Sequence, residues 1–204
     1  MKSNILLMGV AALLVSAAAA NATEYRPFVG VGMGIQGLIY DDAFEDGISG
    51  SYLPKDFVAF GIEGGARFGS YKSIYNGGFS VNIDTTDTEK VNDKFTNETY
   101  AKIKTTALTA TYDNFIRISG DKAKRIDLVL GAGMGAMNYH WDSQVVGIDD
   151  QTAWSTTFAF KAGLDFELSK NLTLSATMRW LVPTREHYNI ATSYIAGGAI
   201  KYMF

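Results

Sequence analysis

From Phe28 to the carboxyl terminus, apolar and polar residues alternate with a period of two. The clearest example runs from Ala153 to Ser169, where even-numbered positions are mostly large and apolar and odd-numbered positions are mostly polar or small. Successive side chains of a β-strand point to opposite faces, so this pattern predicts a strand with one apolar face. The alternation resumes at Leu172 after Lys170-Asn171, which predicts two antiparallel strands joined by a tight turn.

The alternation predicts eight strands, two of them weaker than the rest. The segment Asp46–Leu53 is short. The segment Tyr100–Ile118 requires a break in phase, because Lys102 and Lys104 share parity with apolar residues further along it. The other six segments are Val29–Gln36, Val58–Phe68, Ile126–Met134, Ala153–Ser169, Leu172–Val182 and Thr192–Phe204.

The composition of the polar face distinguishes a soluble barrel from a membrane barrel. A polar face in contact with water should be rich in Lys, Glu and Thr, whereas here it is mostly Gly, Ala, Ser and Thr with scattered charges. Small residues fit a crowded, curved interior, and a continuous apolar face fits lipid. Aromatic residues also lie near the strand ends, as interfacial girdles require: Tyr40, Trp141, Trp154, Trp180 and Phe204. The pattern predicts an all-β, eight-stranded antiparallel up-and-down transmembrane β-barrel, with a soluble β-barrel as the alternative.

Composition supports this fold class. The 204 residues are 47% hydrophobic and 13% aromatic but only 19% charged, with 21 glycines, which argues against a disordered chain, a coiled coil or a nucleic-acid-binding protein. The mean hydropathy is close to zero, whereas several apolar helices of about 20 residues would raise it well above zero. The absence of cysteine excludes disulfides and thiolate metal sites.

The one long apolar run lies at the amino terminus. Lys2 precedes an apolar segment from Ile5 to Ala20, which ends in the small-x-small pattern Ala20-Asn21-Ala22. This arrangement predicts a signal peptide over residues 1–22, cleaved between Ala22 and Thr23, because the strongly apolar part is too short for a membrane anchor. The predicted barrel domain is then residues 23–204, with one domain and a monomeric state.

Connection lengths predict the topology, since bacterial barrels have an even number of strands, short periplasmic turns and long outer loops. The predicted outer loops are Asp41–Glu45, Asn76–Glu98, Asp142–Thr152 and Thr184–Ile190. The predicted periplasmic turns are Pro54–Asp56, Ser119–Arg125 and Lys170–Asn171. This assignment requires Asp46–Leu53 to be a strand.

Three segments resemble those of a known family. They are Phe28-Val29-Gly30-Val31-Gly32-Met33-Gly34, the strand from Phe57 to Gly65, and the terminal Tyr202-Met203-Phe204. Together they look like the small outer-membrane barrels of the opacity and OmpA-type group. The resemblance implies insertion by the outer-membrane assembly machinery, for which Tyr202 and Phe204 form the assembly signal. It also implies a structural, envelope-integrity or surface-adhesion role.

The scattered charges on the polar face are the candidate interior residues. An eight-stranded barrel is just wide enough for side chains to fill it, so opposite charges should pair across the lumen. The alternative is a narrow, porin-like channel with a gated ion path. The predicted structural network consists of Glu63, Arg67, Asp113, Asp127, Lys161, Asp165, Glu167, Arg179 and Lys201.

The two histidines, His140 and His187, are the candidate catalytic bases. A hydrolase needs a histidine, an acid and a hydroxyl within hydrogen-bond reach. Lipid A deacylase barrels carry a His-x-Ser pair, and neither His140-Trp141-Asp142 nor His187-Tyr188-Asn189 matches it. The sequence therefore predicts no enzymatic activity, no cofactor and no catalytic or metal-binding residue, with a lipid-modifying enzyme as the less favoured alternative.

The predicted outer loops are acidic. Outer-membrane lipids and lipopolysaccharide are the expected surroundings, and a host or surface ligand at the loops is the expected partner, because exposed loops on a rigid scaffold commonly determine binding specificity. The acids assigned to these loops are Asp41, Asp42, Glu45, Asp84, Asp87, Glu89, Asp93, Glu98, Asp142, Asp149 and Asp150.

Overall fold

The structure is a computed structural model that describes residues 24–40, 56–70, 73–92, 99–120, 124–143, 151–184 and 190–204. Nine antiparallel strands make up this part of the chain, and eight of them form the barrel. The short β4 pairs only with the outer portion of β5. The strands are β1 (Tyr25–Tyr40), β2 (Asp56–Phe68), β3 (Tyr75–Thr86), β4 (Glu89–Asn92), β5 (Thr99–Ser119), β6 (Ile126–Ser143), β7 (Gln151–Glu167), β8 (Leu172–Pro183) and β9 (Ile190–Met203).

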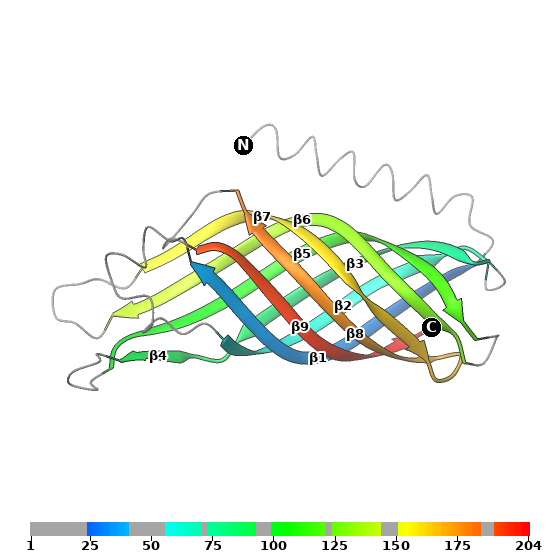
Figure 1. The fold of residues 1–204 in the computed structure, drawn as a ribbon, viewed down its shortest axis with the longest axis horizontal. Coiled ribbons are helices and arrows are strands. Elements are labelled where there is room, and N and C mark those ends of the chain that lie inside the picture. Colours follow the sequence, from blue (N-terminus) through cyan, green and yellow to red (C-terminus); the bar gives the residue numbers. More distant parts are fainter. Residues whose placement is uncertain are drawn as a thin grey trace.

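The sheet closes on itself because β1 pairs with both β2 and β9, while β3 pairs with β5 (Figure 1). The register shows how strongly the strands are staggered. Following the pairs from Phe28 once around the barrel leads back to β1 at Leu38, ten residues further along, through Gly65, Ser80, Thr111, Gly133, Ala159, Leu181 and Ser193. A stagger of this size means that the strands of the closed barrel are tilted against its axis, and eight strands enclose only a narrow interior. The predicted eight-stranded up-and-down barrel is confirmed.

One predicted strand was misplaced. Residues 75–86 form β3, a full barrel strand, although the sequence prediction assigned Asn76–Glu98 to a loop. The outward side chains of β3 include Val81 and Ile83, whereas Ser80, Asn82 and Asp84 are buried in the lumen. The inward polar residues made this segment look like a loop. The predicted strand Asp46–Leu53 lies outside the described residues.

The misplaced strand also changes the topology. β1 pairs directly with β2, with Gly37 opposite Asp56, so Asp56 lies at the same barrel end as the end of β1 and not in a turn at the opposite end. We call this end, which also holds β4, the loop end. The other end, called the turn end, carries the short connections 69–74, 120–125 and 168–171. Gly69 and Gly120 begin two of these turns with φ of 125° and 87°, which side chains other than glycine rarely adopt.

The expected break in phase within β5 is absent. Odd-numbered residues from Ile103 to Phe115 are buried without interruption, and Lys104 faces outward together with Leu108 and Tyr112. β5 has 21 residues, while a membrane crossing needs about 9–11, so Lys102 and Lys104 belong to the part of the strand near the loop end.

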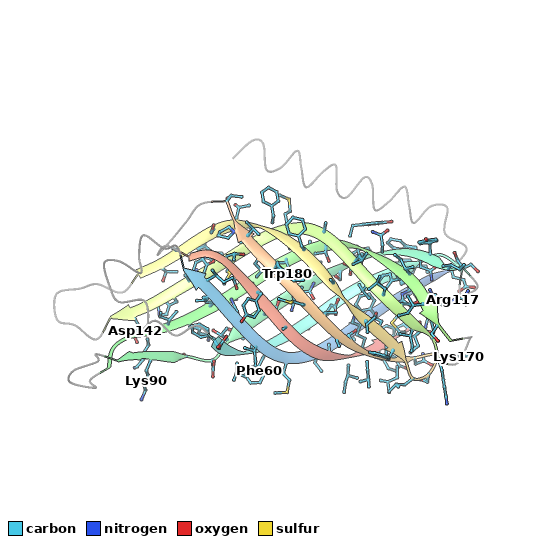
Figure 2. All side chains as sticks on the ribbon, viewed as in Figure 1. Phe60, Lys90, Arg117, Asp142, Lys170 and Trp180 are labelled. Atoms are coloured by element: carbon cyan, nitrogen blue, oxygen red, sulfur yellow. The ribbon has the colours of Figure 1, made fainter. Side chains whose placement is uncertain are left out.

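The outer surface is apolar over the middle of the barrel, as Figure 2 shows around Phe60 and Trp180. Phe60 is 50% exposed and Trp180 37% exposed, which is unusual for large apolar side chains unless a partner or lipid covers them. Exposed neighbours include Val31, Met33, Ile62, Ile83, Leu108, Phe158, Phe160, Leu174 and Ile200. The described segments contain no helix of the length and apolarity that a bilayer crossing would need.

Aromatic residues gather toward both barrel ends. Tyr25 stacks on Phe68 with ring centroids 6.1 Å apart at the turn end, and Tyr202 meets Phe204 edge to face at 5.2 Å. Trp154, on the part of β7 nearer the loop end, is 61% exposed. The side chains of Tyr40 and Trp141 lie outside what the structure describes.

Candidate functional site: the charge network inside the barrel

A tier of ion pairs fills the lumen near the turn end, centred on Arg67 of β2. Its Nη1 donates to Asp127 Oδ2 at 2.9 Å and to Glu167 Oε1 at 2.9 Å. Its Nη2 lies 3.4 Å from Asp165 Oδ2, and its guanidinium lies 3.9 Å from the centre of the Phe115 ring. One buried cation therefore joins carboxylates from β6 and β7 across the barrel.

Each of these carboxylates has a second cationic partner. Arg125 Nε donates to Asp127 Oδ1 at 2.5 Å, and Arg26 Nη1 donates to Glu167 Oε1 at 3.1 Å. Asp165 accepts from Lys201 Nζ at 3.3 Å and from the Ser175 hydroxyl. Charge-assisted hydrogen bonds of this kind are roughly twice as strong as neutral ones, and here each of the three carboxylates accepts at least two of them.

A second tier is centred on Lys161 of β7. Its Nζ donates to Glu63 Oε1 at 2.6 Å and to Asp113 Oδ2 at 3.0 Å. Asp113 also accepts from the hydroxyls of Ser80 and Thr111, both at 2.8 Å. Glu63 links this tier to the first, because its Oε2 lies 3.3 Å from the Nζ of Lys201.

A third tier is one bidentate pair nearer the loop end. Arg179 Nη1 and Nη2 of β8 donate to Asp84 Oδ2 and Oδ1 of β3, both at 2.6 Å. A cavity of about 40 Å³ lies beside the pair and is lined partly by Gly32, Gly61 and Gly197. This volume exceeds the roughly 10–15 Å³ that one water molecule needs, and Glu63, Asn82, Asp84 and Arg179 in its lining supply polar groups to which water can hydrogen-bond.

The lumen beyond these tiers is filled by polar and then apolar side chains. Gln36 donates to Ser193 Oγ at 2.9 Å and accepts from Thr105 Oγ1 at 2.8 Å. A buried apolar cluster surrounds this group. The alternation predicts polar or small residues on the inward face, so it did not predict this cluster. The cluster comprises Leu38, Phe57, Ala59, Ile103, Ala107, Met137, Tyr139, Ala159, Leu181 and Ile195.

Charge is balanced across the described part of the lumen, with six acids and six bases. Paired in this way, buried charges avoid the large cost of an isolated ion in a low-dielectric interior. An ion entering the barrel would have to separate these pairs. The acids are Glu63, Asp84, Asp113, Asp127, Asp165 and Glu167, and the bases are Arg26, Arg67, Arg125, Lys161, Arg179 and Lys201.

All nine residues assigned to the interior network from the sequence lie in these tiers, and sequence reasoning missed three others. The sequence predicts Asp84 among the loop acids, because it predicts a loop over this segment. The structure places Asp84 in β3, where it is buried at 4% exposure. Its parity with the other buried residues of β3 would have revealed it. Arg125 precedes β6 and shares parity with Asp127, and Arg26 lies in β1 before Phe28, where the alternation begins.

The remaining candidate residues lie on the outer surface or outside the described residues. Tyr202 and Phe204 are exposed at the turn end, where the backbone N–H of Phe204 donates to the carbonyl oxygen of Pro27. His140 is exposed on β6, and its Nδ1 lies 3.0 Å from Thr152 Oγ1. Ala22, Thr23 and His187 lie outside the described residues. Within the part of the chain that the structure describes, no group of three or more His, Asp or Glu residues could hold a metal ion.

Comparison with known proteins gave a family and several similar structures. A family model described as an outer membrane protein beta-barrel domain matches residues 8–193. The crystal structure of Ail, the attachment invasion locus protein of Yersinia pestis, has a TM-score of 0.54 and 16% identity, covering 89% of this chain and 100% of Ail. A major outer membrane protein from Thermus thermophilus has a TM-score of 0.54 and 12% identity, covering 89% of this chain and 100% of that protein.

The N-terminal β-barrel domain of Pseudomonas aeruginosa OprF is also similar, with a TM-score of 0.51 and 12% identity over 90% of this chain and 100% of that domain. At these identities the likeness concerns the fold alone. Comparison with curated protein sequences gave no match.

Proposed function

This chain belongs to the outer membrane protein β-barrel family, and from that premise we propose that it is a non-conducting structural barrel whose long connections act at the cell surface. Membership of the family implies an outer-membrane location. The observation that supports a structural role is the filled lumen, in which every tier of charge is paired and an apolar cluster occupies the interior toward the loop end.

The orientation and export route are part of the proposal. Short turns face the periplasm in bacterial barrels, so we assign the loop end to the cell exterior and the turn end to the periplasm. Residues 1–22 would direct export and be removed after Ala22. Tyr202 and Phe204, at the end of the last strand, would be recognised by the assembly machinery.

We further propose that the barrel is not an enzyme. The hydrogen bond between His140 and Thr152 is the one contact that favours the alternative, since it resembles a base beside a hydroxyl nucleophile. Both side chains are exposed, however, on the outer face of β6 and β7. Catalytic groups of this kind usually operate where water is excluded, so the exposed pair does not favour a lipid-modifying activity.

The filled lumen predicts that the protein, reconstituted in planar bilayers, shows no steady conductance. Permeation would require an ion to separate at least the Lys161–Glu63 and Arg179–Asp84 pairs, and breaking buried pairs costs about 3–5 kcal/mol each. Single-channel recording checks this, with a large porin in the same bilayer as the positive control. A stable, ion-selective open state that changes in an Arg179→Met variant would support the narrow channel instead.

A surface role for the connections predicts that they can be shortened without loss of the barrel. Removing residues 93–98 should leave the heat-modifiable gel mobility of the folded protein unchanged and should lower attachment of expressing cells to a host-cell monolayer. The matched control removes residues 77–82, which form the middle of β3 and should abolish the folded mobility. The connections at the loop end are residues 41–55, 87–98, 144–150 and 184–189. If shortening each of them in turn leaves attachment unchanged, the adhesive role is wrong.

A further inference from the structure

A group of basic side chains lies on the outward face of the barrel at the loop end. Lys90 of β4 is opposite Lys102 of β5, and Lys104 of β5 is opposite His140 of β6. His140 is in turn opposite Thr152 of β7 and within hydrogen-bond distance of its hydroxyl. These five residues, which we call the lysine patch, come from four strands, and the pairing register places them side by side. Figure 2 shows Lys90 at this end of the barrel.

The lysine patch borders the apolar surface. The next row of cross-strand partners toward the turn end consists of Thr106, Asn138 and Trp154. Trp154 in this row is exposed. The rows after it contain Leu108 and Phe158, each 47% exposed. Tryptophan is characteristic of the interface between hydrocarbon and headgroups, so the patch lies at headgroup level.

The patch has more positive than negative charge. Lys102 Nζ forms a long ion pair with Asp142 Oδ2 at 3.9 Å, and those two side chains are 38% and 35% exposed. Like charges directly opposite each other on neighbouring strands are destabilising. Lys90 and Lys102 are directly opposite each other, and Lys104 is the next residue after Lys102 on the same face of β5. An anion bound between them would offset the repulsion.

We propose that the lysine patch binds the phosphate groups of a phosphorylated glycolipid in the outer leaflet. The lysines would supply charge, and the Thr152 hydroxyl and His140 ring would supply hydrogen bonds. The acyl chains would lie against the apolar face below, around Leu108 and Phe158. This inference rests on the proposed orientation, in which the loop end faces the cell exterior.

The test compares binding of bisphosphorylated lipid A with binding of the same lipid after removal of both phosphates. The full chain is expressed, purified from outer membranes and placed in zwitterionic detergent micelles. Native mass spectrometry then measures retention of each lipid. We expect the protein to prefer the phosphorylated lipid, and the variant Lys102→Gln/Lys104→Gln to bind it about thirtyfold more weakly, because each of the two lysines near an anionic lipid surface contributes about 1 kcal/mol.

The matched control is Lys124→Gln/Lys170→Gln, which removes two exposed lysines at the turn end. It should retain the preference of the unmodified protein. Equal retention of both lipids by the unmodified protein would overturn the inference, and so would an equal loss in the two double variants. Both variants replace exposed side chains, and heat-modifiable mobility verifies that each is folded.

A separate measurement distinguishes failure of the orientation from failure of the site. A Lys104→Cys variant, in a chain without other cysteines, is treated with a membrane-impermeant thiol reagent on intact cells. Labelling supports the outward loop end. If the cysteine reacts only after the cells are broken, the orientation is wrong and the glycolipid site with it, even where the purified protein still prefers phosphate.

Discussion

Replacement of Lys161 by methionine should lower the free energy of unfolding by about 3–5 kcal/mol, the usual cost of leaving buried charges without their partner. Lys161 is 3% exposed and is the cation that pairs with Asp113, at 3.0 Å. Without it, Asp113 keeps only hydroxyl donors, while Glu63 still has Lys201 at 3.3 Å. Denaturant unfolding in lipid vesicles, followed by tryptophan fluorescence, measures the loss.

Two further variants make this result specific. Adding Asp113→Asn to Lys161→Met removes the uncompensated carboxylate and should recover part of the lost stability. Lys170→Met changes an exposed lysine at the turn end and should stay within about 0.5 kcal/mol of the unmodified protein. A loss below about 1 kcal/mol in Lys161→Met would mean that water replaces the lysine readily, which contradicts a tightly filled lumen.

Replacement of Gly34 by valine should destabilise the barrel by about 3 kcal/mol, at the upper end of what overpacking costs. Gly34 of β1 is the direct partner of Gly197 of β9, at the pairing that closes the barrel. A Cβ on Gly34 would contact the carbonyl oxygen of Ala196 and lie 2.7 Å from the Cα of Gly197. Both are backbone atoms, so relief would require the first and last strands to separate.

Gly64→Val is the matched control for this substitution. The nearest atom to a Cβ there is the carbonyl oxygen of Phe28 at 3.9 Å, an ordinary contact distance. The control should keep its heat-modifiable mobility, while Gly34→Val should yield a smaller folded fraction after refolding. Similar losses in the two variants would show that valine itself, and not the closing contact, causes the defect.

Several features could be predicted because they depend on strand periodicity. Side chains on a strand alternate between two faces whatever its neighbours are, so Trp154, Phe158 and Phe160 could be placed together on one face of β7. The same reasoning put Lys161 and Asp165 on the other face. It failed for β3, where small and polar residues fill the inward positions and the outward ones are only partly apolar.

The pairings inside the lumen could not be predicted, because they depend on register between distant strands. Arg67 and Asp127 are separated by 60 residues, and Arg179 and Asp84 by 95. A shift of one residue in any pairing would change which charges meet. The apolar cluster around Tyr139 and Leu181 has the same origin, because it forms where the inward positions of several strands come together near the loop end.

The sequence by itself determined the class of fold, the identity of the outward-facing side chains on every described barrel strand except β3, and the chemical character of most of the interior, since each follows from local alternation and composition. The tertiary structure alone decided which segment supplies the second hairpin, which carboxylate each cation holds, and that the exposed lysines of β4 and β5 meet at the border of the apolar surface. These features arise when the sheet closes, because closure with a fixed stagger brings together residues that are remote along the chain.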